Sequence, residues 1–150
     1  SNQFIMMEVD MIEIKKRVTN LRNSKENIIS KLFENVSSFD IEARIQAYKK
    51  LREYMIKNHE DIRELVLSGL IDVAKVGLKS TSMIVRYESM SLIQNIVFAS
   101  NEFYQELRLS GTLSYVKKYT KLKEQLPNLY SSAMYIITTV ESNQQTPVKI

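Results

Sequence analysis

Few side chains in this chain of 150 residues could take part in metal chemistry. His59 is its only histidine, and it contains no cysteine. A zinc site usually takes three or four ligands, most of them from these two residue types, so the sequence predicts no metal site and no cofactor. His59 stands in the sequence Asn-His-Glu-Asp at the expected start of a helix, where an exposed linker residue is the simpler interpretation.

Catalytic motifs are also missing from the sequence. Its three glycines lie far apart, so neither a GxGxxG loop nor a Walker A loop can form, and no Gly-x-Ser-x-Gly turn presents a nucleophile. The adjacent acids Glu60 and Asp61 are typical of a helix start, where a carboxylate interacts favourably with the positive end of the helix dipole. We therefore expect a protein that is not an enzyme.

Lysine clusters are the remaining candidates for chemistry. The segment 117–123 has the sequence Lys-Lys-Tyr-Thr-Lys-Leu-Lys, and basic side chains between aromatic rings can bind phosphate or an acidic partner. A second explanation is a helix with one apolar face and solvated lysines, which the spacing favours. In the first explanation, the possible anion-binding residues are Lys117, Lys118, Lys121 and Lys123. In the second, the apolar face that packs on the core consists of Val116, Tyr119 and Leu122.

The charge balance argues against nucleic acid or a membrane surface as the partner. Basic residues outnumber acidic residues by 21 to 17, for a net charge of +4, and the two signs are interspersed. Lys15, Lys16 and Arg17 form a second small basic cluster, to which the same argument applies. We expect another protein as the partner.

The composition favours long helices joined by short loops. Hydrophobic residues make up 44% of the chain, whereas there are only 3 glycines and 2 prolines for turns. No apolar stretch approaches the roughly 20 residues that cross a bilayer, and the first residues lack the basic leader of a signal peptide. Because cysteine is absent, we expect a reducing compartment, the cytoplasm or alternatively the nucleus.

A repeat of about 42 residues organises most of the chain. The stretch NHEDIRELVLSGLIDVAK, from Asn58, aligns without gaps with SNEFYQELRLSGTLSYVK, from Ser100, at an offset of 42 (100 − 58). A partial third copy is shifted by 44, so that Ala133 stands where Ser89 stood (133 − 89). The two extra residues are expected in the connection KLKEQLP, because insertions in loops cost little. This period lies in the range of helical solenoids.

Each copy predicts the same order of helices. Asp40 is a good N-cap for a long helix that ends near Lys57, a short helix follows over 59–67, and a turn at Gly69 leads into a middle helix. The apolar stripe of the long helix consists of Ile41, Ile45, Tyr48, Leu51 and Tyr54, and that of the middle helix consists of Leu70, Val73, Ala74 and Leu78.

The segments 62–80 and 84–100 together resemble one armadillo repeat, in which a short helix leads through a glycine corner into the second and third helices. The segment 29–51 resembles the end of an earlier repeat, and 126–140 resembles the third helix of the last one. The resemblance covers 24–141. It implies an all-α fold, a right-handed armadillo-like α-solenoid of about two complete repeats plus partial repeats. A non-repetitive helical bundle is the alternative.

The resemblance also implies where a partner binds. In armadillo import receptors, each third helix presents a tryptophan and, four residues later, an asparagine to a peptide in the concave groove. The tryptophan position falls on Lys49, Ser91 and Tyr135 in this chain, and the asparagine position on Glu53, Asn95 and Thr139, so only Asn95 matches. The chain has no tryptophan, so the ladder for basic peptides is absent. With Arg52 added, these are the residues that we expect to bind a partner.

The segment 1–23 predicts a separate N-terminal helix. Its apolar residues follow the a and d positions of a heptad, namely Phe4, Met7, Met11, Ile14, Val18 and Leu21. One explanation, which we favour because the heptads are few, is a helix that caps the open end of the repeats. The other is a coiled coil with a second chain, which would make a homodimer. Ser24 is a possible N-cap of the next helix.

Three functions are compatible with these observations. The leading hypothesis is a scaffold or adaptor that binds a peptide or helix of another protein. The resemblance offers a second, because armadillo-like nucleotide-exchange factors of Hsp70 chaperones share the repeat length and the paired Leu-Ser-Gly corners. Binding of anionic lipid or nucleic acid through the lysines is the third. The polar tail 142–150 is expected to be disordered.

Overall fold

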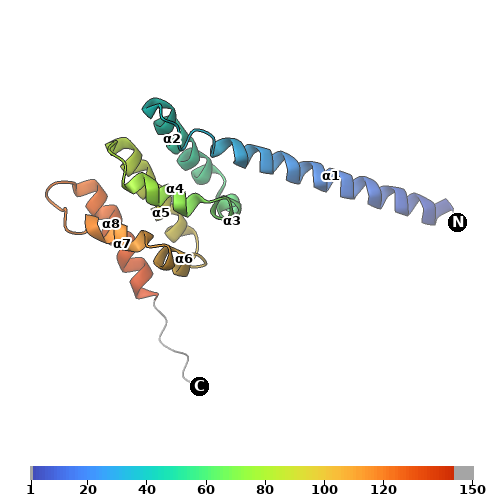
Figure 1. The fold of residues 1–150 in the computed structure, drawn as a ribbon. Coiled ribbons are helices and arrows are strands. Elements are labelled where there is room, and N and C mark those ends of the chain that lie inside the picture. Colours follow the sequence, from blue (N-terminus) through green and yellow to red (C-terminus); the bar gives the residue numbers. More distant parts are fainter. Residues whose placement is uncertain (1, 144–150) are drawn as a thin grey trace, which may run out of the picture.

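A computed structural model describes the backbone of residues 2–143 and the side chains of residues 8–143. These residues form helices and loops without a strand, which confirms the predicted all-α class (Figure 1). Within them, no helix has the length and apolar character needed to cross a membrane. The elements are α1 (Asn2–Leu32), α2 (Ile41–Lys57), the 3-10 helix η1 (His59–Asp61), α3 (Ile62–Leu67), α4 (Leu70–Leu78), α5 (Met83–Ala99), α6 (Tyr104–Leu109), α7 (Thr112–Tyr119) and α8 (Pro127–Ser142).

The order of the helices repeats along the chain at the predicted offsets. A short, a middle and a long helix occur twice, as α3–α4–α5 and again as α6–α7–α8. The starts of the short helices are 42 residues apart (104 − 62), as are those of the middle helices (112 − 70). The starts of the long helices are 44 apart (127 − 83), so the two extra residues lie between α7 and α8, as predicted.

Glycine makes the corner between the short and middle helices. Gly69 precedes α4 with φ +107°, and Gly111 precedes α7 with φ +80°. Residues with a side chain rarely adopt this left-handed conformation, because the Cβ atom crowds the following carbonyl. A Cβ on Gly69 would meet nothing within 4 Å, so the conformation, and not a lack of space, requires glycine there.

The long helices lie side by side. α5 packs between α2 and α8, while α4 packs on α5 and on the middle helix α7 of the next unit (Figure 1). Their inner faces share one hydrophobic core that runs from Ile29 to Val140. Leu51, Leu70 and Ile136 in this core are completely buried, and each such side chain contributes about 1.5–3 kcal/mol through the hydrophobic effect.

Most of the predicted apolar stripe of α2 is buried. Ile45, Tyr48 and Leu51 face the core, and Asp40 caps the helix through a hydrogen bond that its side chain accepts from the Glu42 N–H, as expected. The first position of the predicted stripe differs, because Ile41, in the first turn of α2, is exposed. Tyr54 is half-buried.

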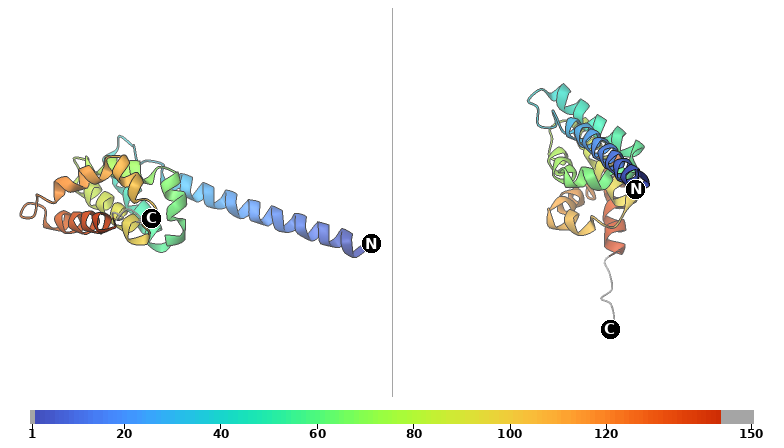
Figure 2. Two further views of the ribbon diagram at one scale, coloured as in Figure 1. Left: turned by 90° about the horizontal axis from the view of Figure 1, so that it is seen from below. Right: turned by 90° about the vertical axis from the view of Figure 1, so that its right-hand side faces the viewer.

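The N-terminal helix differs from the expected one. Helix α1 runs without a break through Ser24, which is therefore not the N-cap of a new helix, and the boundary expected after Asn23 lies inside α1. Most of α1 projects away from the other helices (Figures 1 and 2). Only its last turns pack against them, with Ile29 buried and Leu32 half-buried.

Two predictions concern residues at the ends of the chain. The side chains of Phe4 and Met7, the first two heptad positions, lie outside the described residues. Of the tail 142–150, Ser142 ends α8 and Asn143 follows it, while residues 144–150 lie outside the described part.

Candidate protein-binding surface

The residues expected to bind a partner lie at equivalent positions of the three long helices. Lys49, Ser91 and Tyr135 are each the ninth residue of α2, α5 and α8, because these helices begin at 41, 83 and 127. Glu53, Asn95 and Thr139 are each the thirteenth residue. Glu53 is exposed and the other residues are half-buried. Since α5 lies between α2 and α8, the structure places these positions on adjacent helices.

Arg52 differs from the other predicted residues because it has an internal partner. Its Nε atom forms an ion pair with the carboxylate of Glu88 on α5, and the Glu88 side chain is only 13% exposed. A guanidinium held this way links α2 to α5 and has less freedom to meet another molecule. We assign Arg52 a structural role in addition to any role in binding.

Asn95 is partly engaged within its own helix. Its side-chain Nδ2 donates a hydrogen bond to the Ser91 carbonyl oxygen at 2.8 Å. Among residues 8–143, no hydrogen bond reaches its side-chain oxygen, which can still accept one. An amide oriented in this way, on a half-buried surface, can pair with a backbone N–H of a bound segment.

Exposed apolar side chains, which no sequence pattern singled out as site residues, flank these polar positions. On α5, Ile84, Tyr87 and Phe98 are 45%, 39% and 72% exposed. Together with Ser91 and Asn95 they follow steps of three or four residues, which places them along one side of the helix. On α2, Ile56 is 44% exposed and is the repeat equivalent of Phe98 (98 − 56 = 42).

We call this surface the third-helix face. It consists of Lys49, Glu53 and Ile56 on α2, of Ile84, Tyr87, Ser91, Asn95 and Phe98 on α5, and of Tyr135 and Thr139 on α8. Its two charges are opposite and both lie on α2, so the part on α5 and α8 is neutral. Exposed apolar side chains that gather on one surface are typical of interaction sites.

The burial pattern of the lysine segment 117–123 agrees with a helix that has one apolar face and solvated lysines. Val116 and Tyr119 are buried and Leu122 packs on the core, while the lysines are exposed. The Tyr119 hydroxyl donates a hydrogen bond of 2.8 Å to the Leu78 carbonyl on α4. The apolar face of α7 is therefore part of the contact between the two middle helices.

Several of these lysines already have partners. Lys117 Nζ lies 3.1 Å from the carboxylate of Glu141, and Lys118 Nζ lies 4.2 Å from the centre of the Tyr115 ring. Lys123 Nζ lies 5.9 Å from the centre of the Tyr130 ring, within the range of a cation–π contact. Lys121 is exposed. These contacts are solvent-exposed, so each contributes little to stability.

A buried carboxylate holds α1 to the rest of the protein. Asp61 is 2% exposed; its Oδ1 lies 2.8 Å from Lys25 Nζ, and its Oδ2 accepts a hydrogen bond from the Tyr54 hydroxyl. Burial opposes its charged form, but the hydrogen bonds from Lys25 and Tyr54 and the charge of Lys25 outweigh it and lower the pKa of Asp61. Burial, together with the hydrogen bond to Asp61, raises the pKa of Tyr54 to about 12.

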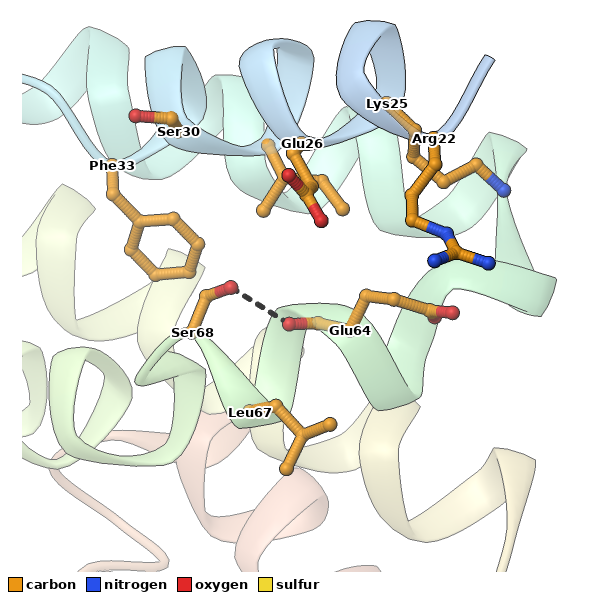
Figure 3. A pocket seen from close by; sticks show the side chains of 9 residues that line it. Arg22, Lys25, Glu26, Ser30, Phe33, Glu64, Leu67 and Ser68 are labelled. Carbon is orange, nitrogen blue, oxygen red and sulfur yellow. Dashed lines mark hydrogen bonds between the residues drawn. The ribbon is translucent and has the colours of Figure 1, made fainter. Parts of the chain in front are cut away.

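An open pocket of about 580 Å³ lies beside this contact, between α1 and α3 (Figure 3). Arg22 and Lys25 lie at one end and Phe33 at the other, with Glu64 and Ser68 across from α1. This pocket could not be predicted from the sequence, because it forms only where the end of α1 meets α3, a distant part of the chain. Its charges have both signs, so the lining indicates no single class of ligand.

His59 is exposed in η1, as expected of a linker residue. Over the part of the chain that the structure describes, no three His, Cys, Asp or Glu side chains come together as a metal site would require. No family model, curated protein or solved structure matches this chain.

Proposed function

We propose that this protein is an armadillo-like α-solenoid that binds a peptide or helix of another protein on its third-helix face. The repeated order of short, middle and long helices supports the solenoid, as do the packing of α5 between α2 and α8 and of α4 on α7. Stacked repeats of this kind offer long surfaces that proteins commonly use for binding. A reducing compartment, the cytoplasm or nucleus, fits the lack of cysteine.

The observation that carries the proposal is the exposed stripe of α5. α5 packs against α2 on one side and α8 on the other, and both contacts bury apolar side chains. Ile84, Tyr87 and Phe98 nevertheless remain exposed beside Ser91 and Asn95. The apolar side chains would supply affinity by losing contact with water, and the Asn95 amide would fix the backbone of the bound segment. This division of roles requires no catalytic group.

Peptide selection followed by substitution tests the proposal. Peptides would be selected from a displayed random library on the wild-type protein, and their affinities measured by titration. We expect Phe98→Ala to weaken binding about tenfold or more, since an apolar anchor that is buried on binding contributes about 1.4 kcal/mol or more. The double variant with Asn95→Ala and Tyr135→Ala should weaken the same peptides. Phe98→Ala should leave the melting temperature unchanged, whereas the double variant should lower it, because the Tyr135 ring packs against the core.

Leu109→Ala is the matched control. Leu109 lies on α6, away from the third-helix face, and is 79% exposed, compared with 72% for Phe98. Leu109→Ala also removes an exposed apolar side chain and should leave binding unchanged. Peptides that bind all of these variants with the wild-type affinity would show that the third-helix face is not the binding surface.

A further inference from the structure

Helix α1 has an apolar stripe that nothing in the described chain covers. It is 31 residues long, and Met11, Ile14, Val18 and Leu21 along it are 52%, 52%, 49% and 72% exposed. These residues are spaced by three, four and three, so they form one side of the helix. Such a stripe is normally buried against another element, and the projection of α1 leaves it accessible from outside (Figure 2).

We propose that α1 pairs with α1 of a second copy of this chain as an antiparallel coiled coil, centred between Ile12 and Glu13. This interface is separate from the third-helix face and does not depend on the function proposed for that face. The apolar layers would include Met11 of one copy against Ile14 of the other. Val18 and Leu21 would lie opposite positions 7 and 4 of the second copy, whose side chains lie outside the described residues.

The charges beside the stripe indicate that the helix that covers it is α1 of a second copy of this chain. With Met11 and Val18 at heptad position a and Ile14 and Leu21 at d, the flanking e positions are Glu8, Lys15 and Arg22, and the charged g positions are Asp10 and Arg17. The acidic residues precede the centre and the basic residues follow it. A helix with this pattern is complementary to itself when one copy is reversed.

The antiparallel arrangement makes every central charge pair attractive. Reversing one helix brings e against e and g against g, so Glu8 faces Lys15 of the second copy and Asp10 faces Arg17. The two-fold symmetry repeats both pairs. In a parallel pair each g position faces the next e position of the other helix, which pairs Asp10 with Lys15 but places Arg17 against Arg22. The charges therefore select the antiparallel orientation.

Val9 and Ile12, each 53% exposed, lie outside this seam at heptad positions f and b.

Charge reversal tests the pairing in the whole 150-residue chain. An acidic variant carries Lys15→Glu and Arg17→Glu, and a basic variant carries Glu8→Lys and Asp10→Lys. By sedimentation velocity at low salt we expect a dimer for the wild type, monomers for each variant alone, and a dimer when the variants are mixed in equal amounts. Recovery in the mixture separates lost pairing from misfolding. A wild type that stays monomeric at high micromolar concentration overturns the proposal, and so does a mixture that stays monomeric.

Cysteine cross-linking tests the orientation, since the chain has no cysteine of its own. In the antiparallel pair, the two copies of residue 21 are about 26 Å apart along the axis, at 1.5 Å per residue, far beyond the roughly 7 Å that a disulfide allows. Leu21→Cys alone should therefore form no disulfide dimer. A mixture of Met11→Cys with Ile14→Cys should yield the mixed disulfide in preference to either homodimer. Rapid cross-linking of Leu21→Cys to itself would indicate a parallel pair and contradict the proposed orientation.

Discussion

Gly77 lies where three helices approach one another closely. It lies in α4, where a Cβ atom would fall 1.8 Å from Ser89 Oγ on α5 and 2.6 Å from the ring of Tyr48 on α2. Both neighbours are buried, at 0% and 1% exposure, and neither can move aside without disturbing the core. The absence of a side chain at this position lets three helices meet.

Substitution of Gly77 by alanine should be costly. We expect Gly77→Ala to lower the free energy of unfolding by about 1–3 kcal/mol or more, because overpacking a core displaces its neighbours. The change would be measured by urea unfolding followed by circular dichroism. Gly69→Ala is the comparison, because it introduces a φ strain of about 1–2 kcal/mol without any clash. An unchanged midpoint for Gly77→Ala would contradict this account of the packing.

The Asp61–Lys25 pair should make the attachment of α1 dependent on pH. The pKa of Asp61 is below its usual 3.8, so this pair stabilises the fold above that pH, and the contribution is lost as the pH falls through the lowered pKa. The hydrogen bond to Asp61, followed by its charge, raises the pKa of Lys25 above 10.5, so at the alkaline end the contribution is lost as the pH rises through that raised value.

Lys25→Met provides the test of this pair. It keeps an unbranched side chain but removes the charge, so the pKa of Asp61 should rise and the variant should be less stable at neutral pH. The difference in unfolding free energy between wild type and variant should shrink as the pH falls below about 4. Unfolding curves recorded across this range measure it, and a difference that is the same at all pH values would speak against the pair.

At the scale of elements, single hydroxyl groups join neighbouring helices. The Tyr119 hydroxyl on α7 donates to the Leu78 carbonyl at the end of α4, and Tyr119 is 5% exposed. The orphan carbonyls at a helix end need such partners. Burial raises the pKa of Tyr119, which keeps its hydroxyl protonated as a donor, although nearby Arg86 opposes this shift.

Removing this hydroxyl should weaken the contact between α4 and α7. We expect Tyr119→Phe to lower the unfolding free energy by about 1 kcal/mol, with up to about 3 kcal/mol if the carbonyl stays unpaired. Tyr115→Phe, on the same helix but half-buried, is the matched control and should change stability by less than about 0.5 kcal/mol. Thermal melting of the two variants side by side measures the difference.

The elements between Ile41 and Ser142 could largely be predicted from the sequence, whereas for α1 a helix was predicted but its unbroken extent to Leu32 was not. Asp40, Gly69 and Gly111 specify starts and corners through local chemistry, and the offsets of 42 and 44 carried one helix assignment onto the next. In α1, the residues around Ser24 are all compatible with a helix interior. A serine caps a helix only where its own backbone is not helical. The sequence alone did not reveal that the backbone at Ser24 is helical.

At the scale of the whole molecule, the positions of the candidate site were predictable but its character was not. The repeat located Lys49, Ser91 and Tyr135 at equivalent points of three helices. The repeat did not show that Phe98 is exposed while Ile96 is buried, because α5 carries apolar residues on several sides. Which of these sides is covered depends on α2, α4 and α8, and therefore on the assembled fold.

The length of the unbroken α1 would set the distance between the two helical bodies of the proposed pair. In the antiparallel pair, about 16 residues of helix separate the centre from Ile29, where the helical body begins, so each body lies about 25 Å from the two-fold axis. A helix of this length is a stiff spacer. Two third-helix faces carried on one rod would engage a ligand with two suitably spaced motifs through avidity, whereas closely spaced motifs would reach only one face at a time.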